Sequence, residues 1–129
     1  MSTLQVGTIK NTGSGYMVFR DSSNTEVGKL GGAWVLFNGE NTPAIRDSFN
    51  VSSITDQGQG RYDINLSNGF ANSNFAWAGS GGRGNGDANC VCGEQIQHRT
   101  SSKIQTLFQD VQNNTRDPSH ASCIFFGDQ

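Results

Sequence analysis

Apolar and polar residues alternate with a period of two along much of the chain, and the 3.6-residue period of an amphipathic helix is not seen. Residues 62–66 alternate most cleanly and follow a Gly-rich connection at residues 56–60, which predicts a hairpin. Residues 33–37 form a continuous apolar run that ends at Asn38-Gly39, a favoured turn dipeptide. We expect this run to be a central strand buried on both faces, with Trp34 in the core.

The remaining apolar segments are short and are separated by turn residues. Gly, Asn, Ser and Asp fill the connections, and residues 79–87 are so rich in Gly that we expect them to form a mobile loop. About eight or nine short strands predict an all-β fold, an antiparallel β-sandwich of jelly-roll-like type. Further strands are expected over residues 16–20, 45–51, 75–78, 90–92, 96–98, 103–111 and 121–126.

The density of large apolar side chains changes near residue 30. Residues 1–30 hold few of them, so this segment is not expected to bury a core of its own. We predict that it is an extended N-terminal arm or short stem that depends on neighbouring subunits. Residues 31–129 then form the β-sandwich knob, a single domain of ordinary size.

Composition separates a folded chain from a disordered one. Only 33% of the 129 residues are hydrophobic, but the net charge is only -2 and 8 Phe, 2 Trp and 2 Tyr recur at strand-like spacing, which favours a folded chain. The scattered Lys and Arg residues do not predict binding to nucleic acid. The sequence has no signal-peptide pattern and no apolar run of about 20 residues, so we expect synthesis in a cytoplasm and no membrane insertion.

Few residues are available for metal binding. Cys90, Cys92 and Cys123 are an odd number and are expected to be reduced, partly buried thiols. With His98 and His120 they are the only soft ligand types in the chain, and their spacing does not match a structural zinc site. We therefore expect no metal or other cofactor, although threefold symmetry could bring one His from each of three chains to an axial ion.

Motifs for catalysis are also not recognisable. Neither His stands near a Ser or Cys in a known nucleophile motif, and a glycan hydrolase would need paired carboxylates in a larger scaffold with a cleft. The Gly-rich segment at residues 82–87 is one imperfect copy of a calcium-binding repeat, and such repeats bind only when they are stacked. The chain is not expected to be an enzyme.

Two central segments resemble a family of virion proteins from tailed phages of aquatic bacteria, which are often described as tail fibres. The segments are AWVLFNG at residues 33–39, and AIRDSFNVSSITD at residues 44–56 with GRYDIN at residues 60–65. The opening residues 2–13 and the closing residues 122–126 are similar to the same proteins. Leu36 departs from the family pattern, which commonly has a polar residue there, and the sequence after Gly69 is idiosyncratic.

The resemblance implies a non-enzymatic, homotrimeric knob that projects from the surface of a virion. Its role would be capsid decoration (a cement protein) or a component of a tail fibre. The alternative role is a receptor-binding fibre tip that recognises a glycan or protein on the host surface. The expected partners are copies of the chain itself, other virion proteins and, for the alternative, a host cell-surface glycan. The short arm favours decoration or a small fibre component.

Five residues are candidates for contacts with these partners. Leu4, Val6 and Ile9 are the only sizeable aliphatic residues near the start of the arm, and we expect them to anchor it to another virion protein. Trp77 stands between two alanines just before the Gly-rich segment, and an exposed aromatic ring can stack on a sugar. Trp77 and the nearby Arg83 are therefore the candidates for contact with a ligand or receptor.

Overall fold

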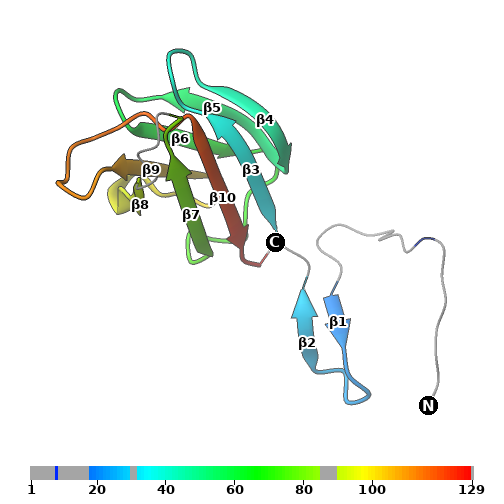
Figure 1. Cartoon of the computed structure of the whole chain (residues 1–129). Helices are drawn as coiled ribbons and strands as arrows, with labels where there is room; N and C mark the ends of the chain where they lie inside the picture. The colour runs from blue at the N-terminus through cyan, green and yellow to red at the C-terminus, as the bar shows by residue number, and fades with distance from the viewer. Residues whose placement is uncertain (1–7, 9–17, 30–31, 85–89, 129) are drawn as a thin grey trace. The chain divides into compact units, whose positions relative to one another are not determined.

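The computed structural model of the chain describes residue 8 and residues 18–29, 32–84 and 90–128 (Figure 1). The chain divides into two compact units, Met1–Leu30 and Gly31–Gln129. In the first unit, β1 (Val18–Arg20) and β2 (Glu26–Lys29) form an antiparallel hairpin. The carboxylate of Asp21 stabilises the turn, because its Oδ1 accepts hydrogen bonds from the backbone N–H groups of Ser23 and Thr25, each at 2.9 Å.

The second unit is built from strands that pair only in the antiparallel sense. In chain order they are β3 (Ala33–Asn38), β4 (Ala44–Phe49), β5 (Val51–Asp56), β6 (Arg61–Leu66), β7 (Ala76–Gly82), β8 (Val91–Glu94), β9 (Lys103–Gln109) and β10 (His120–Phe126). One sheet has the order β4–β3–β10–β7 and the other has the order β5–β6–β9–β8 (Figure 1). The two sheets confirm the predicted all-β antiparallel sandwich. No helix in the described part of the chain is long and apolar enough to cross a membrane.

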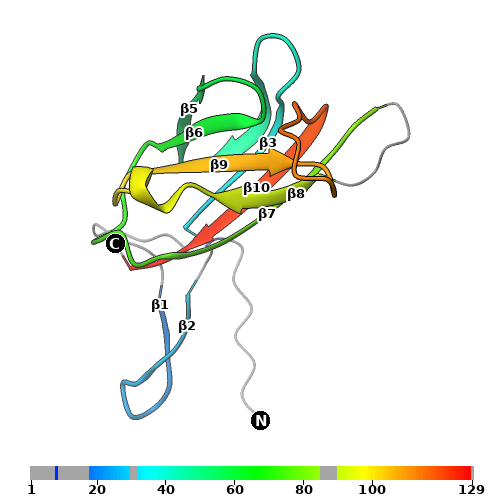
Figure 2. The ribbon, with the colours of Figure 1, turned by 90° about the vertical axis from the view of Figure 1, so that its left-hand side faces the viewer.

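An aromatic cluster joins the two sheets, which face one another in Figure 2. Phe37 of the first sheet lies 5.3 Å from Tyr62 and 6.1 Å from Phe108, measured between ring centroids. Tyr62 and Phe108, both of the second sheet, are 5.9 Å apart, and all three pairs meet edge to face. Such pairs contribute about 0.5–1.5 kcal/mol each beyond the burial of their area. The cluster is fully buried and forms the centre of the core.

The hydroxyl group of Tyr62 anchors two connections at one end of the sandwich. It lies 2.9 Å from the carbonyl oxygen of Gly39 and 2.7 Å from Oδ1 of Asp117, so its proton is shared between two acceptors. The same Asp117 oxygen accepts a hydrogen bond from the backbone N–H of Gly60 at 2.7 Å. A buried polar group thereby obtains the partners that it needs in the core.

Between β4 and β5 the chain passes from the first sheet to the second, and the connection is the single residue Asn50. This residue has a φ of 56°, and its side-chain Nδ2 donates to the carbonyl oxygens of Gly32 at 2.9 Å and Asn68 at 3.0 Å. Asn tolerates this left-handed conformation better than most residues. The expected single strand over residues 45–51 is therefore wrong, because the segment divides into β4 and β5.

The expectation that β3 is buried on both faces is also wrong. Ala33, Val35 and Phe37 face the core, whereas Trp34 is 39% exposed and Leu36 is 37% exposed. Both sets are apolar, so the period of two was hidden in the sequence. The outward set belongs to the surface described in the next section.

The Gly-rich segment begins as a strand and not as a loop. Residues 79–82 complete β7 and pair with β10 as far as His120. A Cβ atom at Gly81 would lie 2.7 Å from the Phe108 ring, so the absence of a side chain lets the strand pack on the core. Residues 85–89 lie outside the described residues, and the mobility of that part stays a prediction. Ile96–His98, expected as a strand, forms the short 3-10 helix η1.

Three buried groups predict that the protein loses stability at alkaline pH. Burial raises the pKa of Tyr62 and the pKa of Cys90, and a hydrogen bond with Cys92 together with burial raises the pKa of Cys123. Unfolding releases protons from these groups once the pH exceeds the ordinary values of about 8.5 for Cys and about 10 for Tyr. We expect the urea midpoint to fall from about pH 8.5 upward, and more steeply above about pH 10. A midpoint that stays constant from pH 7 to pH 10.5 would contradict this, and Tyr62→Phe should remove the steeper part.

Candidate functional site

The outward-facing side of the β4–β3–β10–β7 sheet carries an unusual number of exposed large apolar side chains, and we call it the outer apolar face. Alternation on β3 sends Trp34 and Leu36 outward, and alternation on β10 sends Ile124 and Phe126 outward. Ile124 is 41% exposed and Phe126 is 45% exposed. An exposed apolar cluster on a folded domain marks a surface that interacts with another molecule.

The edge strand β4 extends this face. Phe49 stands opposite the outward-facing Trp34 in the register and is 51% exposed. Ile45 is also exposed, but after the register shift it stands opposite the inward-facing Phe37 and so belongs to the other side of the sheet. Asp47, paired with Leu36, is the charged residue that β4 adds beside these apolar side chains. The outer apolar face therefore consists of Trp34, Leu36, Phe49, Ile124 and Phe126.

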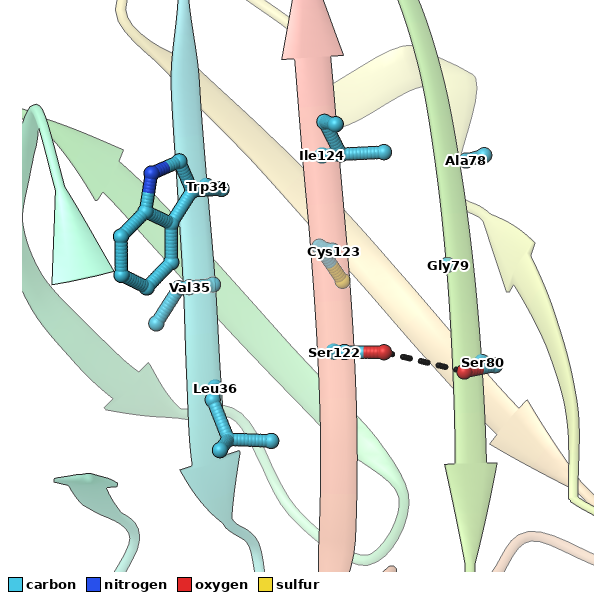
Figure 3. A pocket seen from close by; sticks show the side chains of 9 residues that line it. All are labelled: Trp34, Val35, Leu36, Ala78, Gly79, Ser80, Ser122, Cys123 and Ile124. Carbon is cyan, nitrogen blue, oxygen red and sulfur yellow. Dashed lines mark hydrogen bonds between the residues drawn. The ribbon is translucent and has the colours of Figure 1, made fainter. Parts of the chain in front are cut away.

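A shallow pocket of about 500 Å³ lies on this face between β3, β10 and β7 (Figure 3). Trp34, Leu36 and Ile124 border it, while its β7 side has only the small residues Ala78 and Ser80. The hydroxyl groups of Ser80 and Ser122 are 3.0 Å apart and hydrogen-bond to each other (Figure 3). The lining residues include no carboxylate and no imidazole, so this pocket offers contact surface and not proton transfer.

Two thiols lie beneath the pocket, on the core side of Gly79. A Cβ atom at Gly79 would lie 2.8 Å from Sγ of Cys92 and 3.2 Å from Sγ of Cys123, so the glycine makes room for both. Both residues are free thiols, and so is the buried Cys90. The hydrogen bond with Cys92 and burial raise the pKa of Cys123, which keeps this thiol protonated and unreactive at neutral pH.

Trp77 faces the space between the sheets and not the outer apolar face. Its ring stacks on Phe125 with centroids 6.5 Å apart, and its indole Nε1 donates a 2.7 Å hydrogen bond to Oε2 of Glu94. Arg99 approaches the same Glu94 oxygen at 3.3 Å, so the indole belongs to a polar cluster at the edge of the core. Arg83 follows β7, and its Nε is buried without a hydrogen-bond partner in the described structure.

The other residues singled out in the sequence are spread widely. Leu4, Val6 and Ile9 lie outside the described residues, so their role in attachment stays a prediction. His98 is exposed in η1, and His120 begins β10, where its Nδ1 lies 3.3 Å from the Ser119 hydroxyl. Among the described residues, no group of three or more His, Cys, Asp or Glu side chains could hold a metal ion.

Sequence reasoning therefore missed the residues that form the outer apolar face. A signal was present on β10, where Ser122, Ile124 and Phe126 alternate with Ala121, Cys123 and Phe125. Because both sets contain large apolar residues, the alternation does not tell which set is covered by the second sheet. The structure answers this through the inward contacts of Phe125.

No known protein family matches the sequence, and no curated protein is similar to it. The structure is similar to part of the phiAB6 tailspike, whose crystal structure was determined in complex with three-repeated oligosaccharides of Acinetobacter baumannii surface polysaccharide. The TM-score is 0.57 and the sequence identity is 11%. The similarity covers 100% of this chain and 30% of the tailspike chain. The two proteins thus share a fold over a segment that makes up less than a third of the tailspike.

Proposed function

We propose that this chain is a non-enzymatic structural protein of a tailed-phage virion. It assembles as a homotrimer whose β-sandwich units project from the particle, as capsid decoration or as a component of a tail fibre. Residues 1–30 attach the trimer to another virion protein, with Leu4, Val6 and Ile9 as anchors.

The observation that carries this proposal is the likeness of the whole chain to part of a phage tailspike. The outer apolar face adds support, because a sheet face with five exposed large apolar side chains is suited to binding another protein. The pocket on that face has no carboxylate or imidazole among its lining residues, and the pKa of its one thiol, Cys123, is raised, which favours a structural role over catalysis.

Labelling of particles tests the proposed location. Antibodies raised against the purified protein should decorate particles of the phage that encodes it, and quantitative mass spectrometry should give its copy number. Hundreds of copies would identify capsid decoration, and a few tens or fewer would identify a fibre component. Absence of the protein from purified particles would refute the proposal.

The arm is tested in the full-length chain. Replacing Leu4, Val6 and Ile9 together by Asp should abolish binding to particles that lack the protein, because charged side chains cannot occupy apolar anchor pockets. The control replaces the polar residues Thr3 and Thr8 by Asp and should still bind. Equal binding of both variants would exclude the arm as the attachment device.

A second candidate function is a receptor-binding fibre tip that recognises a host surface glycan. The observation that favours it is an exposed indole, Trp34, beside the paired hydroxyl groups of Ser80 and Ser122, since aromatic rings and hydroxyls are common in sugar sites. Binding of surface polysaccharide by the wild-type protein, with loss in Trp34→Ala, would support this role. The outer apolar face cannot both hold a glycan and be covered by protein.

A further inference from the structure

The outward faces of the two sheets differ in character. On the second sheet, Asp63 accepts hydrogen bonds from Gln105 at 2.7 Å and pairs with Lys103 at 3.0 Å. Next to it, Nδ2 of Asn65 donates to the hydroxyl groups of Ser53 and Thr55. Asp63 and Gln105 are themselves buried in this network, whereas Ser53 and Thr55 are exposed, so this side is a connected polar layer that meets water at its outer residues. Among the described residues, the outer apolar face has the Ser80–Ser122 hydrogen bond but no comparable network, and its pattern is typical of a sheet covered by protein.

The apolar area is large enough to form the centre of a stable interface. The five side chains are 37–51% exposed, and at about 200 Å² for a full aromatic side chain they leave on the order of 400 Å² of apolar surface in contact with water. A stable interface buries about 800 Å² on each partner, so this patch would supply about half of it. One of the Ser80 and Ser122 hydroxyls already donates to the other, so a covering partner has to accept from only one O–H group of this pair.

The shape of the face is suited to contact with a second copy of the same chain. The β4 side carries the projecting ring of Phe49, whereas the β7 side carries the shallow pocket with its small residues Ala78 and Ser80. In a closed ring of identical subunits, one part of a surface meets a different part of the same surface on the next copy. One face that bears both the projection and the hollow supplies both halves of such a contact.

We infer that the outer apolar face is the surface through which copies of this chain bind one another, with the β4 side of one copy against the pocket of the next. The inference rests on the proposed homotrimer and adds the surface that forms it. The polar face of the second sheet then remains in contact with solvent.

The test places a carboxylate at the centre of the face in the full-length protein. Light scattering should give a trimer for the wild-type protein, and Ile124→Glu should raise the dissociation constant at least roughly 100-fold, because an unpaired buried charge strongly destabilises an interface. The matched control is Val91→Glu, an exposed β-branched residue at the start of β8, which is 61% exposed and should leave the trimer intact. A trimer of Ile124→Glu as tight as the wild type would overturn the inference.

A second measurement covers the case in which Ile124→Glu fails to fold. Trp77→Phe leaves Trp34 as the only tryptophan in the chain, so fluorescence reports on the outer apolar face alone. Acrylamide should quench Trp34 weakly in the trimer and strongly after dilution to monomer. Strong quenching within an intact trimer would overturn the inference and leave the proposed trimer standing. A monomeric wild-type protein would overturn both.

Discussion

Replacing Gly60 by Ala should destabilise the protein by roughly 4 kcal/mol or more, a value at the extreme of single substitutions. Gly60 has a φ of 70°, and an added Cβ atom would lie 2.5 Å from the carbonyl oxygen of Phe108 and 2.9 Å from the backbone nitrogen of Arg116. These are backbone atoms and cannot rotate away. To make room for the Cβ atom, the backbone at Phe108 and Arg116 would have to move away from residue 60. This movement would also break the 2.7 Å hydrogen bond from the Phe108 N–H to the Gly60 carbonyl oxygen.

Gly58→Ala is the matched control for this substitution. Gly58 also has a positive φ, 104°, but nothing lies within 4 Å of its added Cβ atom. It therefore carries the backbone strain of a left-handed alanine, about 1–2 kcal/mol, without the steric clash. Urea unfolding of both variants should show a much larger loss for Gly60→Ala. Equal losses would mean that the backbone near Arg116 moves aside freely.

Replacing Ile104 by Ala should cost about 2–5 kcal/mol, because the side chain leaves a cavity between the sheets. Ile104 is 1% exposed and stands opposite the fully buried Ile64 in the β6–β9 register. The close-packed interior cannot collapse fully around the missing atoms, so the loss exceeds the transfer free energy alone. Urea or thermal unfolding measures the change directly.

The control removes the same atoms from the surface. Ile96 in η1 is 75% exposed, and Ile96→Ala should change stability by less than about 0.5 kcal/mol. If the two Ile→Ala variants were equally stable, the packing of β9 against the first sheet would be wrong.

The predictability of each strand depended on how different its two faces are. β6 was recognised because inward Tyr62, Ile64 and Leu66 contrast with outward polar neighbours. β3 has apolar residues on both faces, so its position could be predicted but the orientation of its side chains could not. The glycines of β7 favour a loop on local grounds, whereas the close approach of Gly81 to Phe108 and of Gly79 to Cys92 and Cys123 explains why this segment packs as a strand.

The candidate site was harder to predict than the fold. An apolar residue such as Ile124 belongs either to the core or to an interface, and only the position of the second sheet decides between them. Trp77 was selected for its small neighbours, yet its stacking on Phe125 places it at the edge of the core. Trp34 was assigned to the core for its apolar neighbours, and it lies on the outer apolar face.

Side chains alternate between the inner and outer sides of the sheet along β3 and β10, so each strand has an inward set and an outward set. The two sets are subject to different physical requirements. Inward residues such as Val35 and Cys123 must fit the packed interior of the sandwich. The outward residues Leu36 and Ile124 are 37% and 41% exposed and lie outside that interior. Substitutions in the outward set therefore bear less on the core of the sandwich than on what the face contacts. If copies of the chain bind one another through this face, each such substitution alters every copy at once, so a change at one outward position should be compensated at another outward position of the same strands.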